Sequence, residues 1–72
     1  MHQAQLISSI KQRRESLSVT QETLAELSEV SLRTIKQFES GKGNPTLHTL
    51  EKILAVLGLE ICLQLKQLTP ES

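Results

Sequence analysis

The sequence predicts a small all-α domain followed by one C-terminal β-strand, and three observations support this fold class. Apolar residues recur at helical spacing in the first sixteen residues and again between residues 47 and 57. Residues 19–41 contain two closely spaced helix starts, each with a capping residue and a flanking apolar pair. After Gly58 the apolar residues alternate with polar ones, which is the period of a strand.

The first helix is expected over about Gln3 to Ser16. Its apolar face is formed by Leu6, Ile7, Ile10 and Leu17. Arg14 falls near the same face, so the apolar side of this helix must also accommodate a guanidinium group.

The two central helices, over about Gln21 to Ser28 and Leu32 to Ser40, begin with the same local signal. Thr20 and Ser31 can each act as an N-cap, because a side-chain oxygen can accept a backbone N–H of the first turn. An apolar residue before each cap can pack against one inside the helix as a hydrophobic staple. The two staple pairs are Val19 with Leu24 and Val30 with Ile35.

The connection between these helices is only residues 28–30. The small side chain of Ala25 allows the second helix to cross the first closely and steeply. A steep crossing, a short connection and a polar exposed face on the second helix are typical of the DNA-binding helix-turn-helix.

The region from about Leu6 to Leu57 resembles the Xre/Cro-type family of prokaryotic helix-turn-helix regulators. The resemblance is carried by Arg14, Thr20-Gln21, Leu24-Ala25, Val30-Ser31, Thr34-Ile35, Phe38-Glu39, Gly41-Lys42, Pro45-Thr46-Leu47 and Leu57-Gly58. It implies a lambda-repressor-like bundle of four main helices. The family usually has glycine in the turn where this chain has Glu29. That position often needs a positive φ, which costs a residue with a side chain about 1–2 kcal/mol.

The fourth helix is expected after a loop at residues 41–45. Gly41 can end the third helix in a left-handed conformation, and Pro45 forces Asn44 to be extended. Thr46 can cap the fourth helix, which Gly58 ends. Its apolar stripe is Leu47, Leu50, Ile53, Leu54 and Leu57.

The C-terminal strand is predicted to carry one apolar face, made of Leu59, Ile61, Leu63 and Leu65. A lone strand is not stable in water, so the simplest partner is the same segment of a second subunit. A continued helix is the alternative, because Leu is a good helix former. The expected boundaries are residues 1–58 for the DNA-binding domain, 59–68 for the dimerisation strand and 69–72 for a disordered tail.

The segment at the end of the fourth helix and after it makes the family resemblance more specific. A helix-turn-helix followed by LGLEICLQL at residues 57–65 is similar to the HipB type of antitoxin. That resemblance implies a homodimeric repressor that binds an inverted-repeat operator and a HipA-like kinase toxin. Two alternatives stay open. One is a stand-alone phage-type or restriction-linked repressor without a toxin, and the other is a toxin-binding module with little DNA binding.

Composition excludes some classes of function. Tyr and Trp are absent and Phe38 is the only aromatic residue, which argues against binding single strands by base stacking. The formal net charge of +0 is unusual for a nucleic-acid-binding protein. Positive charge is nevertheless local, because Arg33, Lys36 and Lys42 cluster around the third helix and its exit.

Neither a cofactor nor a catalytic site is expected. His2, His48 and Cys62 are too few and too far apart for a metal site. Asp is absent, no catalytic triad can be assembled, and Gly41-Lys42-Gly43 is a helix exit. The single cysteine suits a reducing cytosol, and neither a signal peptide nor a membrane span is evident. We therefore expect a cytoplasmic, nucleoid-associated protein without enzymatic activity.

Base reading is expected from the outward side of the third helix. Arg33 can form a bidentate pair with guanine, Gln37 suits adenine, and Leu32 can contact a thymine methyl group. Ser31 can reach a base edge or serve only as a cap. The alternative for this face is ordinary solvated polar surface.

Phosphate contacts are expected from Thr20 and Gln21, because backbone N–H groups at a helix start also favour an anion. Lys36 is expected at the DNA backbone too. The family resemblance adds Thr34, Ser40 and Lys42. It also implies that Glu39 forms a partly buried structural ion pair with Arg14, which would remove a negative charge from the DNA-reading helix.

Overall fold

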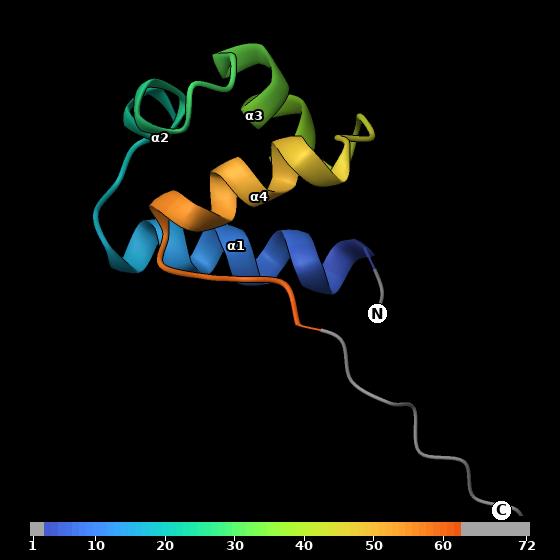
Figure 1. Ribbon diagram of the computed structural model, residues 1–72, viewed down its shortest axis with the longest axis horizontal. Coiled ribbons are helices and arrows are strands. Elements are labelled where there is room, and N and C mark those ends of the chain that lie inside the picture. The colour runs from blue at the N-terminus through green and yellow to red at the C-terminus, as the bar shows by residue number, and fades with distance from the viewer. Residues whose placement is uncertain (1–2, 63–72) are drawn as a thin grey trace, which may run out of the picture.

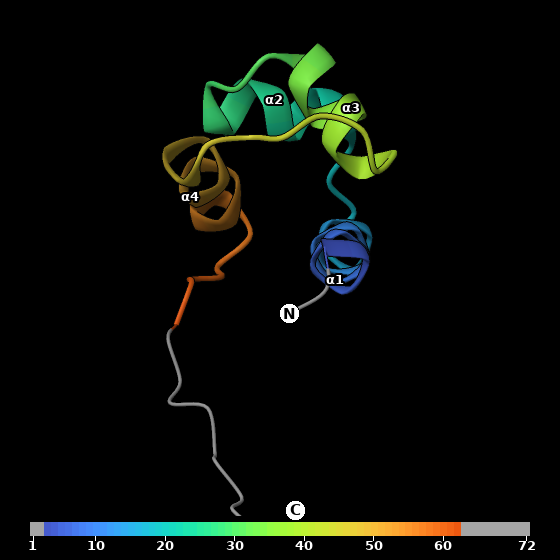
Figure 2. The same ribbon diagram turned by 90° about the vertical axis from the view of Figure 1, so that its right-hand side faces the viewer.

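The computed structural model describes residues 3–62, which form an all-helical bundle (Figure 1). The helices are α1 (Gln3–Ser16), α2 (Gln21–Ser28), α3 (Leu32–Glu39) and α4 (Leu47–Val56). In both views α2 and α3 lie at the top, and Figure 2 shows α4 and α1 on the two sides below them. Four helices were predicted and four are found in this part of the chain. None of them is long and apolar enough to cross a lipid bilayer.

The hydrophobic core receives side chains from all four helices. Its buried members are Ile10, Leu24, Val30, Ile35, Phe38, Ile53, Leu54 and Leu57. Both members of the second predicted staple, Val30 and Ile35, are buried, while Val19 of the first packs against the core beside buried Leu24. The core therefore fixes α3 through two residues that point inward, which leaves its other side free.

The helix starts follow the predicted capping chemistry. The side-chain oxygens of Thr20, Ser31 and Thr46 accept hydrogen bonds from backbone N–H groups three residues later, at 3.0, 3.1 and 3.1 Å. All three capping residues have extended backbone angles, as N-caps do. The three predicted caps are confirmed.

Three helix ends share a left-handed capping motif, and after α4 it consists of Gly58 with φ +70° and the Leu59 N–H, which donates to the Leu54 carbonyl at 2.9 Å. After α3, Gly41 has φ +84° and the Lys42 N–H donates to the Gln37 carbonyl at 2.9 Å. After α1, Ser18 takes the equivalent position with φ 58°, and the Val19 N–H donates to the Arg14 carbonyl at 3.1 Å. The role of Gly41 was predicted, whereas that of Ser18 was not, because serine gives no such signal.

Glu29 occupies the turn between α2 and α3 with φ 61° and ψ 29°, in the left-handed region. The expectation that this residue needs a positive φ is confirmed. The Ser28 hydroxyl supports the turn, since it donates to the Leu24 carbonyl at 2.6 Å and accepts the Val30 N–H at 3.3 Å. In Figure 1, α2 is seen end-on and α3 from the side, so the two helices cross steeply.

Replacing Glu29 by glycine should stabilise the domain. Glycine removes a Cβ clash worth about 1–2 kcal/mol but loses about 0.5–1 kcal/mol of backbone entropy, so a net gain of up to about 1.5 kcal/mol is expected. In a domain of this size that corresponds to a rise of a few degrees in melting temperature. Glu29→Ala is the matched control, because it removes the charge but keeps the Cβ. A comparable rise in both variants would assign the effect to the carboxylate.

Two apolar residues do not lie where the periodicity placed them. Leu17 is 42% exposed because α1 ends at Ser16 and the chain turns away at Ser18. Leu47 is 62% exposed, because the first turn of α4 extends past the core. The third helix also ends at Glu39, with Ser40 as its C-cap, one residue earlier than predicted.

The predicted C-terminal strand begins in a segment without regular secondary structure. Residues 59–62 form no strand, and Leu63 and Leu65 lie outside the described residues. The Leu59 N–H donates to the Leu54 carbonyl at 2.9 Å and its side chain packs against the core, whereas Ile61 is 42% exposed. Cross-subunit pairing of this segment stays a prediction.

Candidate nucleic-acid interface

The outward side of α3 is polar and basic. Because Ile35 and Phe38 point into the core, Arg33, Lys36 and Gln37 project on the opposite side and are exposed. Leu32 is partly buried at the start of the helix. Of the four residues predicted to face outward, Arg33, Lys36 and Gln37 are exposed and share one helical surface, whereas Leu32 is only partly exposed.

Two hydroxyl groups occupy the start of α3. The Ser31 hydroxyl donates to the Thr34 hydroxyl at 2.8 Å and accepts the Thr34 N–H at 3.1 Å. Ser31 is exposed and Thr34 is partly buried. The cap role of Ser31 is confirmed, and both hydroxyls can still offer an oxygen to a ligand at this end of the helix.

The acid of α3 is neutralised inside the protein. Arg14 Nε donates to Glu39 Oε2 at 2.8 Å and Arg14 Nη2 donates to Glu39 Oε1 at 3.0 Å, a bidentate arrangement between two buried residues. Arg14 Nη1 also donates to the Val19 carbonyl at 2.7 Å. The hydrogen bond to Glu39 raises the pKa of Arg14 above its ordinary value, so the guanidinium stays charged. Glu39 therefore presents no free carboxylate on the reading helix.

A third residue joins this ion pair. Gln21 Nε2 donates to Glu39 Oε1 at 3.0 Å, which ties the first residue of α2 to the last residue of α3. Gln21 was predicted to contact phosphate, and one of its two amide hydrogens is already used inside the protein. Its sequence neighbours gave no sign of this contact, because Glu39 is 18 residues away.

The remaining candidates for phosphate contact lie around the two helix starts and the exit of α3. Thr20, Lys36, Ser40 and Lys42 are exposed. The Thr20 hydroxyl serves as the cap of α2, and the Ser40 hydroxyl donates to the Gln37 carbonyl at 2.9 Å. Over residues 3–62 the ion pair of Arg14 with Glu39 is the only salt bridge, so the Lys36, Lys42 and Arg33 side chains have no carboxylate partner there.

The loop from α3 to α4 packs against the reading helix and borders a shallow depression of about 290 Å³. The lining residues are Thr34, Gln37, Phe38, Gly43, Asn44, Pro45, Thr46 and Thr49. Asn44 and Gly43 had not been assigned a functional place from the sequence. Their position beside Gln37 could not be read from residue spacing, since it depends on the path of the loop.

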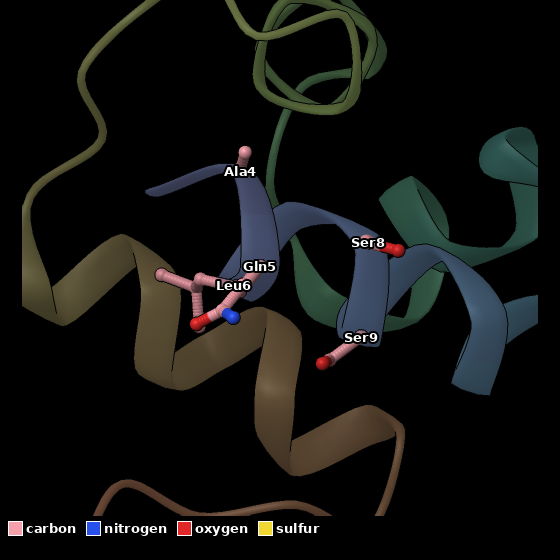
Figure 3. Close-up of a pocket in the computed structure, with 5 residues that line it drawn as sticks. All are labelled: Ala4, Gln5, Leu6, Ser8 and Ser9. Carbon is pink, nitrogen blue, oxygen red and sulfur yellow. The ribbon is translucent and has the colours of Figure 1, made fainter. Parts of the chain in front are cut away.

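Two further depressions border α1, away from α3. One follows α1 and is lined by Ala4, Gln5, Leu6, Ser8 and Ser9, with Leu6 and Ser9 on the side toward α4 (Figure 3). None of these five residues is titratable. The other is an apolar groove of about 280 Å³ between α1, α4 and the segment after α4. Figure 2 looks nearly along both helices and shows α1 and α4 as the two sides of this region.

The other residues with reactive or metal-binding side chains do not gather into a site in the described part of the chain. No group of three or more metal-binding side chains occurs within residues 3–62. Cys62 is exposed, and its pKa is raised because its thiol donates to Glu60 Oε2 at 3.5 Å beside that negative charge. A raised pKa lowers the thiolate fraction at neutral pH and with it the reactivity of the thiol.

Comparison with known proteins assigns this architecture to a family. Residues 10–64 match the helix-turn-helix family, which covers α2, α3 and the ion-pair residues described above. No curated protein and no solved structure matches the chain. The steep crossing of α2 and α3, the buried Arg14–Glu39 pair and the exposed basic side of α3 agree with the family match. The chain therefore belongs to the Xre/Cro-type helix-turn-helix family of DNA-binding transcription regulators.

Proposed function

We propose that this protein is a sequence-specific repressor that acts as a homodimer on an inverted-repeat operator. The observation that carries the proposal is the side of α3 on which Arg33, Lys36 and Gln37 are exposed while Glu39 is held by Arg14. Arg33 then reads guanine and Gln37 reads adenine in the major groove. Leu32 and Ser31 complete the base-reading end, and Thr20, Gln21, Thr34, Lys36, Ser40 and Lys42 contact phosphates.

The second subunit in this proposal covers the apolar groove beside α1. Six apolar side chains border the groove: Leu6, Ile10, Leu50, Leu54, Leu59 and Ile61. A single 72-residue chain buries a small core, so covering this surface adds stabilisation that the monomer lacks. The two-fold axis of such a dimer has to place both α3 helices on one side, because half-sites lie one helical turn or a multiple apart.

We further propose that the protein is the antitoxin of a HipA-like kinase module and that it is not itself an enzyme. The support is the alternating segment LGLEICLQL at residues 57–65, which is similar to the end of HipB-type antitoxins. Copurification with a kinase encoded by an adjacent reading frame tests this point. A dimer that binds its operator but no such kinase would instead be a stand-alone repressor.

Selection from a random duplex library tests the repressor proposal most directly. The wild-type protein should enrich an inverted repeat, and a gel-shift assay should retain the complex in excess random DNA. At least a thousandfold preference over random duplex is typical of specific binding. If no sequence is enriched, the protein is better described as an interaction module, which its net charge of +0 would suit.

Arg33→Ala and Lys42→Ala should separate base reading from backbone contact. Loss of a bidentate contact to guanine should cost about 1–3 kcal/mol of specific binding and relax the preference at one operator position. Loss of Lys42 should weaken binding to operator and to random DNA alike. It should also reduce the slope of log affinity against log salt concentration by about one. Affinities measured by fluorescence anisotropy at several salt concentrations provide both quantities.

Lys11→Ala is a suitable control for these variants, because it removes an exposed positive charge from α1. It should leave both the preference and the salt slope nearly unchanged. Equal losses on operator and random DNA from Arg33→Ala would remove that residue from base readout.

A further inference from the structure

Two glycines in the loop after α3 have the same backbone conformation but different surroundings. Gly41 and Gly43 both have φ +84°, a conformation that strains any residue with a side chain. A Cβ built on Gly41 would meet no atom within 4 Å. A Cβ built on Gly43 would lie 3.3 Å from Gln37 Cβ and 3.7 Å from Gln37 Oε1. Of these two positions, therefore, only Gly43 is one where an added side chain would crowd the reading helix.

This contact involves a part of Gln37 that cannot easily move. A separation of 3.3 Å is closer than ordinary van der Waals contact, and Gln37 Cβ is fixed to the backbone of α3. The loop is also anchored to the same residue, because the Lys42 N–H donates to the Gln37 carbonyl at 2.9 Å. Because no rotamer of Gln37 moves its Cβ, an added methyl group at Gly43 must displace the loop, and a displaced loop changes the surroundings of the Gln37 carboxamide.

We propose that Gly43 is a specificity-determining residue: because it has no side chain, the loop passes close enough to Gln37 to restrict the Gln37 carboxamide. The proposal rests on the proposed function, in which Gln37 reads a base. A carboxamide restricted to few rotamers loses less entropy when it pairs with adenine, and it presents its oxygen and nitrogen in a fixed order. Gly43 contacts no base in this role and acts through Gln37.

The matched pair Gly43→Ala and Gly41→Ala tests this inference. Both variants add one methyl group at φ +84°, so their backbone strain is similar, but only the first crowds Gln37. Against operators varied at each base pair, Gly43→Ala should lose about tenfold discrimination at the position that Gln37→Ala also relaxes. Gly41→Ala should keep that discrimination. In a Gln37→Ala background, Gly43→Ala should cause no further loss of preference.

A measurement on the free protein separates this inference from the proposed function. The side-chain amide resonances of Gln37 in ¹⁵N spectra should shift in Gly43→Ala and stay unchanged in Gly41→Ala. If the wild-type protein enriches no operator, the proposed function fails, while these spectra still decide whether Gly43 positions Gln37. Should Gly43→Ala not fold, Gly43→Asn with Gly41→Asn replaces the pair, because asparagine tolerates left-handed backbone.

Three results would overturn the inference. The first is the same loss of discrimination from both alanine variants, and the second is full discrimination by Gly43→Ala with unchanged Gln37 resonances. The third is an equal loss of affinity for operator and random duplex from Gly43→Ala. That last result would mean that the loop shift acts on the Lys42 phosphate contact instead of on base reading.

Discussion

Neutralising one end of the Arg14–Glu39 pair should cost the domain about 3–5 kcal/mol of unfolding free energy. In Arg14→Met the Glu39 carboxylate stays buried without its cation, and in Glu39→Gln the guanidinium stays buried without its anion. Small domains have about 5–15 kcal/mol of stability in total. Either variant should therefore lose a large share of its stability, and urea titration followed by circular dichroism would show this as a much lower unfolding midpoint.

The double variant Arg14→Met with Glu39→Gln should cost less than the sum of the single changes. Each single change leaves a charge behind, whereas the double change leaves none. Some cost should remain, because the Val19 carbonyl loses the donor Nη1 of Arg14 at 2.7 Å. We expect a coupling free energy of about 2–3 kcal/mol, within the range for residues of one hydrogen-bond network.

Gln21→Ala is the reference variant for this cycle. It removes the hydrogen bond to Glu39 Oε1 but leaves the ion pair intact, so it should cost only about 1–2 kcal/mol. If Gln21→Ala lost as much unfolding free energy as Arg14→Met, the Gln21 amide and not the ion pair would account for the stability of this cluster. Small and additive losses in the cycle would mean that the charges are solvated in solution.

The helices and their limits could be predicted because local chemistry determines them. A threonine or serine before an apolar repeat marks a helix start, and the three side-chain caps follow this rule without tertiary information. Similarly, the positive φ of Glu29 was expected because related chains have glycine at that position. Both features depend on residues within one turn of each other.

Apart from the left-handed conformation of Ser18, the features that escaped prediction depend on contacts between distant residues. Gln21 reaches Glu39 across 18 positions, and Arg13 Nε donates to the Leu57 carbonyl at 2.9 Å across 44. Leu47 fits an apolar stripe but is exposed, because periodicity gives the side of a helix and not how far the core extends along it. No sequence pattern predicts the steric role of Gly43, since that role depends on the path of the loop relative to α3.

Removing residues 60–72 should dissociate the proposed dimer and abolish most specific DNA binding. In the monomer, Ile61 is 42% exposed at the edge of the apolar groove, and Leu59 packs on the core beside it. Leu59 and the buried core remain in the truncated chain, so the helices should still form. A dimer that binds two half-sites together has about 10²–10⁴-fold higher affinity than a monomer that binds one half-site. Specific binding should fall by that factor, and binding to random duplex should fall much less.

Two serine substitutions at neighbouring positions make this prediction sharper. Both residues line the groove, but Ile61→Ser removes a large apolar side chain, whereas Cys62→Ser replaces only the sulfur atom of an exposed thiol by oxygen. Ile61→Ser should weaken the dimer in sedimentation equilibrium, and Cys62→Ser should not. Ile61→Pro should weaken it further if the Ile61 N–H pairs with a partner strand. The truncated protein could instead stay dimeric and bind an inverted repeat as tightly as the full chain. Neither the groove edge at Ile61 nor a paired C-terminal segment would then be needed, and the dimer contact would lie elsewhere on the domain.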